Sequence, residues 1–186
     1  MSDQARPLAS AALFDTAIGT CALAWSATGV LRFALPEDDP ESVREYILRG
    51  HRVYEIREAE PTPEIVDVIA RVRAHLDGEL DDLVSIPLDT ATLNDFDRAV
   101  YDITRAIAPG HTLTYGTVAN RIGAPGGAQA VGQSLGRNPI PLIVPCHRVL
   151  AADNALTGFS APGGVTTKQR LLEIERTPGF GEATLF

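Results

Sequence analysis

The sequence predicts an α/β protein in two parts, a small sheet with a helix or two followed by a mostly helical region. Apolar residues alternate early in the chain and recur at helical spacing later. The length of 186 residues suits one generous domain or two small ones, and 45% hydrophobic residues allow a sizeable core. We expect residues 1–10 to be a flexible tail, residues 11–90 one domain and residues 91–178 the other.

The elements of the first part follow from apolar alternation and turn residues. The segment Phe14 to Leu35 reads as two strands, the first through Ile18 to Trp25 and the second after a turn at Gly29. We further expect an acidic turn over 36–40, a helix over 42–48 capped by Ser42, a strand over 52–56, a helix over 63–76 and a short connection over 80–88.

The second part begins with a helix over 95–107, whose apolar stripe includes Phe96 and Val100. Two short helices over 115–122 and 128–135 follow, joined by the turn Pro125-Gly126-Gly127. This pair predicts a helix-turn-helix, with a plain helical hairpin as the alternative. A buried apolar run over 140–144 comes next, and a helix capped by Thr166 or Thr167 closes the region near Arg176.

The charge is unevenly distributed between the two parts. The net charge of −8 argues against a nucleic-acid binder. However, residues 1–94 hold 17 acids and 8 arginines, a balance of −9, whereas residues 95–186 hold 7 acids and 8 bases, a balance of +1. Any contact with DNA is therefore expected from the second part.

Two further features indicate a cytoplasmic protein. No stretch reaches the roughly 18 apolar residues of a membrane span, and the first residues lack a secretion signal. Cys21 and Cys146 are the two cysteines, which is too few for a disulfide framework and favours a reducing compartment.

Cys146 is the candidate reactive residue. A lone cysteine is most often a small buried hydrophobe. This one follows the buried run and Pro145, and it precedes His147 and Arg148, whose positive charges would favour the nucleophilic thiolate. His147 could act as a base through a bridging water. Glu175 shares an apolar helix face with Leu171 and could orient the imidazole, although a surface acid is the plainer interpretation.

A zinc site is the rival interpretation of these cysteine and histidine residues. The four histidines are scattered along the chain, and no C-x-x-C or H-x-x-x-H pair is present. A zinc site would therefore need long-range convergence of few ligands, and we expect no metal.

The block Pro-Cys-His-Arg-Val at 145–149, preceded by Gly-Arg-Asn-Pro at 136–139, resembles the O6-alkylguanine-DNA alkyltransferases, also called methylated-DNA–protein-cysteine methyltransferases. The resemblance covers about 96–175 well, including Tyr115-Gly116, Ala130-Val131-Gly132 and Lys168 to Leu172. It is looser in the first part, through residues 15–19 and 29–31. It implies a ribonuclease-H-like first domain and a winged-helix-like second one.

The resemblance also implies the chemistry. Cys146 would accept the alkyl group of O6-alkylguanine, with O4-alkylthymine as a second candidate substrate, once and irreversibly, without a cofactor. Double-stranded DNA would be bound through the minor groove by a monomer, with the lesion base flipped out. The resemblance also assigns residues. His147, held by Glu175, would deprotonate the thiol through a water, Tyr115 would donate a hydrogen bond to the leaving guanine and press on the 3′ phosphate, and Asn138 would brace the turn before the active-site segment. The carbonyls of Cys146 and Val149 would accept from the exocyclic amine of guanine, Ser160 would lie over O6, and the DNA would be contacted by Gly127, Ala128, Gln129 and Arg137.

Two departures from the family pattern bear on these roles. Gln129 stands where relatives carry an arginine that fills the gap left by the flipped base, so weaker DNA binding or slower flipping is expected. The loop from Ser160 to Gly164 is longer than usual, so the pocket lid can differ. Two other function classes remain: a lesion-binding module without transfer, and a Cys-His hydrolase, which would need an oxyanion hole and a direct Cys–His contact.

Overall fold

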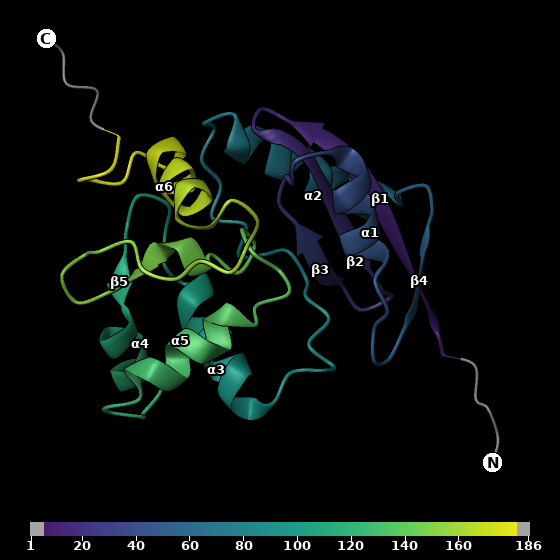
Figure 1. Cartoon of the computed structure of the whole chain (residues 1–186). Helices are drawn as coiled ribbons and strands as arrows, with labels where there is room; N and C mark the ends of the chain where they lie inside the picture. The colour runs from purple at the N-terminus through teal and green to yellow at the C-terminus, as the bar shows by residue number, and fades with distance from the viewer. Residues whose placement is uncertain (1–5, 182–186) are drawn as a thin grey trace, which may run out of the picture.

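The structure is a computed structural model that describes residues 6–181, and it confirms the α/β class. A four-stranded sheet with helices is followed by a helical region (Figure 1). The elements are β1 (Leu8–Thr16), β2 (Gly19–Trp25), β3 (Val30–Ala34), α1 (Pro40–Leu48), β4 (Glu55–Glu58), α2 (Pro63–Leu76), α3 (Asp95–Arg105), β5 (Leu113–Thr114), α4 (Tyr115–Arg121), α5 (Ala128–Gly136), the 3-10 turn η1 (Cys146–Arg148), β6 (Val149–Leu150) and α6 (Gly164–Ile174).

The sheet is mixed and has the order β3-β2-β1-β4. Strands β1, β2 and β3 form an antiparallel meander, and β4 joins β1 in parallel. We expected two strands where the chain forms three. Ile18 lies in the tight turn between β1 and β2, where Gly19 has a φ of +129°. The apolar side chain of Ile18 continued the strand-like alternation, so the sequence pattern did not reveal this turn.

The expected tail is shorter than predicted. Strand β1 begins at Leu8, and Leu8 to Ala11 pair with β4, so residues 8–10 belong to the sheet. Residues 1–5 lie outside the described part of the chain. The domain division near residue 90 stays a prediction.

Helix α2 has the predicted bounds, whereas α1 begins earlier than expected. Pro40 occupies the first turn of α1, and the Asp39 side chain accepts the backbone N–H of Ser42. Asp39, not Ser42, is therefore the N-cap. Strand β4 differs in the other direction, because it begins at Glu55, three residues later than expected.

The sheet is covered on both faces. A small cluster rich in alanine lies between the sheet and α1, with Val43 and Ile47 from the helix. The opposite face packs on α2 through larger side chains such as Leu23 and Phe33. This second cluster continues into the helical region, because it also contains buried residues of α3 to α6. The two parts of the chain therefore share one hydrophobic core.

Helices α3, α4 and α5 pack together, and α4 and α5 form the predicted helix-turn-helix (Figure 1). In α4, Val118 and Ala119 are buried. In α5, Val131 and Leu135 are buried as predicted, but Ala130 is exposed and Ser134 takes the inward position.

The run Ile140–Val144 is buried, as expected, and connects α5 to η1. The backbone N–H of Phe33 in β3 donates to the carbonyl of Pro139, at 2.9 Å, which ties the sheet to this segment. Helix α6 is capped by Gly163, not by Thr166 or Thr167; the Thr167 hydroxyl donates back to the Pro162 carbonyl.

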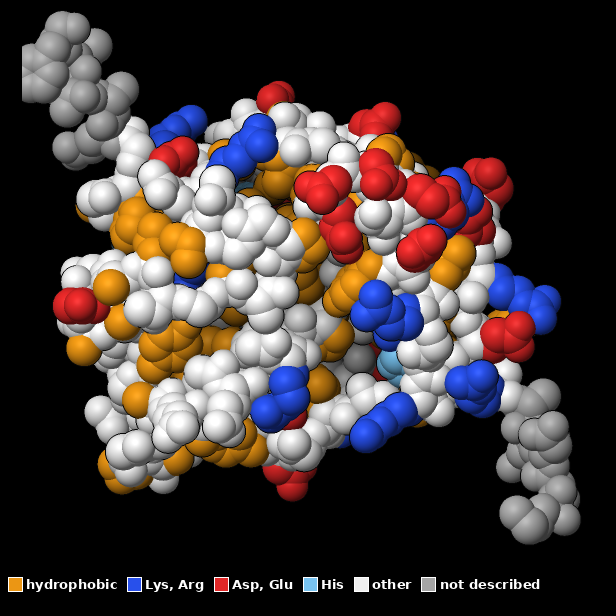
Figure 2. Space-filling view, viewed as in Figure 1, with side chains coloured by type: hydrophobic (Ala, Val, Ile, Leu, Met, Phe, Trp, Pro, Cys, Tyr) orange, Lys and Arg blue, Asp and Glu red, His pale blue; other side chains and the backbone are white. Residues whose placement is uncertain are grey.

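The acidic side chains gather over the N-terminal half, at the upper right in Figure 2. This agrees with the charge balance of the two halves of the sequence. Among residues 6–181, no helix has both the length and the apolar character needed to span a bilayer.

Candidate active site

Cys146 opens the turn η1, directly after the buried run and directly before β6. Its side chain is almost covered, with 8% of the residue exposed. It lines two spaces. One is a cavity of about 280 Å³ that includes Arg32, Arg49 and Asn138. The other, of about 20 Å³, lies towards Tyr115. Cys146 is therefore almost enclosed but borders two open spaces.

Tyr115, the first residue of α4, lies close to Cys146. Both residues line the smaller space, and the charge of Cys146 is one of the causes that act on the pKa of Tyr115. The phenol is half-buried, and burial raises its pKa. It therefore stays protonated at neutral pH and can donate a hydrogen bond into the small space beside the sulfur.

Glu175, the C-cap residue of α6, is the centre of a buried hydrogen-bond network. Its residue is 1% exposed. Oε1 accepts from Nε2 of His147 at 2.8 Å and from Nη2 of Arg148 at 2.8 Å, and Oε2 accepts from Nε of Arg148 at 3.0 Å. The inward face predicted for Glu175 is confirmed, and the surface interpretation is wrong.

This network determines the proton positions on His147. Because Nε2 faces a carboxylate, it carries the hydrogen, and Nδ1 of the neutral ring is then an acceptor. Among the described residues, Nδ1 has no hydrogen-bond partner although it is buried. Burial lowers the pKa of His147, against the opposing effect of Glu175. The ring thus presents a free basic nitrogen in the interior.

The charges around the thiol differ from the prediction. Arg148 turns away from the sulfur, towards Glu175 and the carbonyl of Ile107. Burial raises the pKa of Cys146, although the Asn138 side chain and the charge of Lys168 act in the opposite direction. The free thiol is therefore the resting form, and a base is needed to deprotonate it.

Asn138 holds the segment between α5 and the cysteine turn. Its Nδ2 donates to the carbonyl of Val144 at 2.9 Å, and its Oδ1 accepts the N–H of Ile140 at 3.0 Å. Both bonds close the loop that carries the buried run, so this side chain fixes the approach to Cys146.

Of the guanine-reading groups suggested by the resemblance, Cys146 and Ser160 line the spaces beside the thiol, and Val149 directly follows η1. The carbonyl of Val149 accepts a hydrogen bond from Nζ of Lys168 at 2.8 Å. The carbonyl of Cys146 accepts a hydrogen bond from the backbone N–H of Val149. Each carbonyl oxygen keeps a second lone pair. Ser160 lines both spaces beside the thiol, and its hydroxyl donates to the carbonyl of Gly136 at 2.8 Å.

The expected DNA-contacting residues lie at the two ends of α5. Gly127 and Ala128 begin the helix and are half-buried, and Gln129 is exposed in its first turn. Arg137 caps the other end and donates to Asp97 at 3.1 Å. The glutamine is free to meet a ligand, whereas the arginine is partly neutralised.

Two buried polar residues of this region, Lys168 and His75, received no role from the sequence. Lys168 is fully buried, and its Nζ lies 5.8 Å from the centre of the Tyr115 ring. His75 is fully buried and contacts Glu175. A signal was present for each, because Lys168 continues the stripe of Leu171 and Glu175, and His75 continues the stripe of α2.

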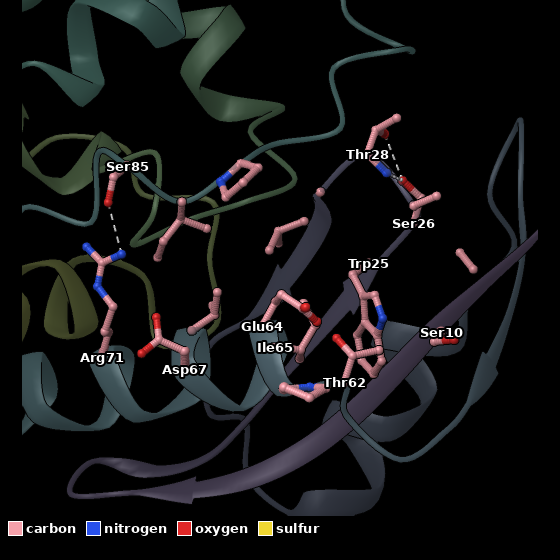
Figure 3. A pocket seen from close by; sticks show the side chains of 18 of the residues that line it. Ser10, Trp25, Ser26, Thr28, Thr62, Glu64, Ile65, Asp67, Arg71 and Ser85 are labelled. Carbon is pink, nitrogen blue, oxygen red and sulfur yellow. Dashed lines mark hydrogen bonds between the residues drawn. The ribbon is translucent and has the colours of Figure 1, made fainter.

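A further cavity, of about 870 Å³, lies away from Cys146, in the N-terminal part (Figure 3). It is walled by the start of β1, the turn between β2 and β3, the first half of α2 and residues 85–87, and Cys146 is not among its lining. Arg71 donates to Ser85 across one side of it, as the dashed line shows. Within residues 6–181, no three His, Cys, Asp or Glu residues group as metal ligands would.

Comparison with known proteins shows what this chain is similar to. The family described as "6-O-methylguanine DNA methyltransferase, DNA binding domain" matches residues 95–177. The methylated-DNA–protein-cysteine methyltransferase of Mycobacterium tuberculosis is 42% identical over 118 residues, which cover 63% of this chain and 69% of the relative.

Solved structures extend the similarity to almost the whole chain. The crystal structure of the Mycobacterium tuberculosis O6-methylguanine methyltransferase matches with a TM-score of 0.71 and 32% identity, over 91% of this chain and 93% of that one. The crystal structure of that organism's OGT in complex with DNA matches with a TM-score of 0.73 and 30% identity, over 90% of this chain and 93% of that one. The chain therefore belongs to the O6-methylguanine-DNA methyltransferase family, the methylated-DNA–protein-cysteine methyltransferases, which repair DNA by direct reversal.

Proposed function

We propose that Cys146 is the residue that accepts the alkyl group. The observation that carries the proposal is a thiol beside open space and adjacent in sequence to a buried His–Glu pair. Cys21, in contrast, is fully buried in β2, and burial raises its pKa to about 12. A cysteine sealed in this way is a core residue and not a nucleophile.

The transfer is a displacement at carbon. His147 Nδ1 takes the thiol proton through a bridging water, and Glu175 stabilises the resulting imidazolium. The sulfur attacks the alkyl carbon, the bond from that carbon to O6 breaks, and its electron pair stays on guanine. The guanine gains a proton from the Tyr115 hydroxyl, and the thiol proton held by His147 returns through water to the phenolate, so protons balance. The products are a thioether at Cys146 and an unmodified base, so each molecule repairs one lesion.

The neighbouring residues receive positioning roles in this proposal. The Tyr115 hydroxyl donates to the departing guanine, and its ring presses on the 3′ phosphate. The carbonyls of Cys146 and Val149 accept from the exocyclic amine, Ser160 lies over O6, and Asn138 braces the turn. The space of about 20 Å³ between Tyr115 and Cys146 holds about one water, so the loop around Ser160 must shift when a purine enters.

The helix-turn-helix is the proposed contact with the DNA minor groove. Helix α5 begins with Gly127, Ala128 and the exposed Gln129, which would occupy the gap left by the flipped base. Arg137 would approach a phosphate from the other end of the helix. We further propose that the protein acts as a monomer in the cytoplasm, on O6-alkylguanine and also on O4-alkylthymine.

Intact-protein mass spectrometry tests the assignment. The wild type, incubated with duplex DNA carrying O6-methylguanine, is expected to gain one methyl on Cys146. Cys146→Ala should bind this DNA without gaining mass, and the matched control Cys21→Ala should gain the methyl as the wild type does. A wild type that binds the lesion and stays unmodified would contradict the transfer and support a binding module.

A further inference from the structure

His75 connects the N-terminal part to the buried network around Glu175. It lies near the end of α2, 100 residues before Glu175, and neither side chain is accessible to solvent beyond 1%. Nε2 of His75 lies 3.1 Å from Oε1 of Glu175. This is the same oxygen that accepts from His147 and from Arg148. Two imidazoles therefore meet on one carboxylate oxygen.

The backbone fixes which nitrogen of His75 carries the hydrogen. The N–H of Asp81 donates to Nδ1 of His75 at 3.1 Å, so Nδ1 is an acceptor. In a neutral ring the hydrogen is then on Nε2, which faces Glu175. His75 is thus held on one side by the loop after α2 and donates on the other side to the carboxylate that orients His147.

We propose that His75 is a positioning residue for the alkyl transfer, acting through Glu175 on His147. This inference rests on the function proposed for Cys146, His147 and Glu175. The guanidinium of Arg148 binds both carboxylate oxygens and fixes the plane of the group. His75 adds a donor on the oxygen that His147 uses, and it comes from a different part of the chain. The N-terminal part thereby helps to set the orientation of the base beside the thiol.

Two amide variants separate the two hydrogen bonds of His75. In His75→Gln the amide nitrogen reaches about the position of Nε2, so a donor to Glu175 is kept. In His75→Asn the shorter amide can still accept from the Asp81 N–H but does not reach Glu175. A hydrogen bond to a charged acceptor typically contributes enough for about a tenfold change in rate.

The experiment is single-turnover transfer on duplex DNA carrying O6-methylguanine, with methylation of Cys146 followed by intact mass. At saturating DNA, His75→Asn is expected to be about tenfold slower than the wild type, and His75→Gln within about threefold of it. The dissociation constant for DNA should be unchanged in both, because His75 is buried away from α5. Val72→Ala, a cavity variant three residues earlier in α2, should lower stability without changing the transfer rate.

Equal rates for the two amide variants, or a Val72→Ala variant as slow as His75→Asn, would overturn the inference. A wild type that leaves Cys146 unmethylated would instead refute the proposed function, which the same assay reports separately. A second measurement does not depend on the variants folding. Nitrogen-15 NMR of the wild type should show His75 with its hydrogen on Nε2 alone, and a hydrogen on Nδ1 would also overturn the inference.

Discussion

Glu175 shows how a single charged residue can organise the interior. Burial acts to raise the pKa of this carboxyl, but His147, His75 and Arg148 together hold it well below its usual value. The folded state therefore binds this proton less readily than the unfolded chain does. The resulting stability is present above the unfolded pKa, about 4.3, and is lost as the pH falls through that range towards the folded value.

Glu175→Gln is expected to destabilise the protein by about 3 to 5 kcal/mol at pH 7, because Arg148 would remain buried without its carboxylate. Urea unfolding at several pH values measures this effect. The difference between the wild type and the variant should shrink below about pH 4, where the wild type loses its own contribution.

Glu173→Gln is the matched control, since Glu173 is an exposed acid on the same helix, α6. It should change the free energy of unfolding by less than about 0.5 kcal/mol. Similar losses for the two variants would mean that Glu175 acts as an ordinary helix residue and not as the partner of a buried cation.

At the scale of the element, periodicity predicted helices better than strands. Helix α2 has the predicted ends because Pro63 begins it and Gly78, with a φ of +96°, follows it. The first strand pair was merged, since an apolar Ile18 in the turn is indistinguishable from a strand residue. The cap of α1 was misplaced because Asp39 and Ser42 both suit an N-cap, and only the hydrogen bond between them decides.

At the candidate site, too, local sequence patterns predicted some features and missed others. The reactive segment was predicted because Cys146, His147 and Arg148 are adjacent in the sequence. The orientation of Arg148 towards Glu175 could not be predicted, because a 3-10 turn directs successive side chains differently from a strand. His75 was considered only as one of four scattered histidines in the argument against a zinc site. Its polar partner is 100 residues away, and no local pattern reports such a contact.

Helix α5 carries the prediction that concerns DNA. Gln129 is exposed in the first turn of this helix and brings no charge. Gln129→Arg should therefore speed the repair of duplex DNA more than the reaction with free O6-benzylguanine, which needs no base flipping. An added phosphate contact should also steepen the dependence of log affinity on log salt by about 0.9.

Both substrates are needed to interpret the Gln129→Arg variant. An equal acceleration with DNA and with the free base would show that residue 129 acts on the pocket and not on the duplex. Gln133→Arg is a suitable control, since Gln133 is exposed one turn later on the same helix and tests whether any added charge on α5 gives the effect.

At the scale of the whole molecule, the continuous core links the site to the sheet. Side chains from β2, β3 and α2 belong to the same buried cluster as Val149 and Leu171, which lie in β6 and α6. The contact of His75 with Glu175 and the bond from Phe33 to Pro139 add polar links between the two parts. A strain created at Cys146 is therefore expected to affect the unfolding of the entire chain.

The product of the reaction should create such a strain in proportion to the size of the alkyl group. Cys146 is 8% exposed, and the space on its Tyr115 side is about 20 Å³. A methyl group needs little adjustment there, whereas a benzyl group exceeds the space and overpacks the surroundings, at a cost of about 1 to 3 kcal/mol. Each kcal/mol lowers the midpoint of thermal unfolding by roughly 2 to 4 °C in a chain of this size.

Calorimetry of the unreacted, methylated and benzylated protein tests this expectation. The benzylated form should unfold several degrees below the unreacted protein, with the methylated form between them and nearer to the unreacted one. Cys146→Ala incubated with O6-benzylguanine should show no shift, which separates the covalent group from the reagent. If benzylation left the midpoint unchanged, the alkyl group would have to lie in the larger cavity lined by Arg32 and Asn138 and not in the small space beside Tyr115.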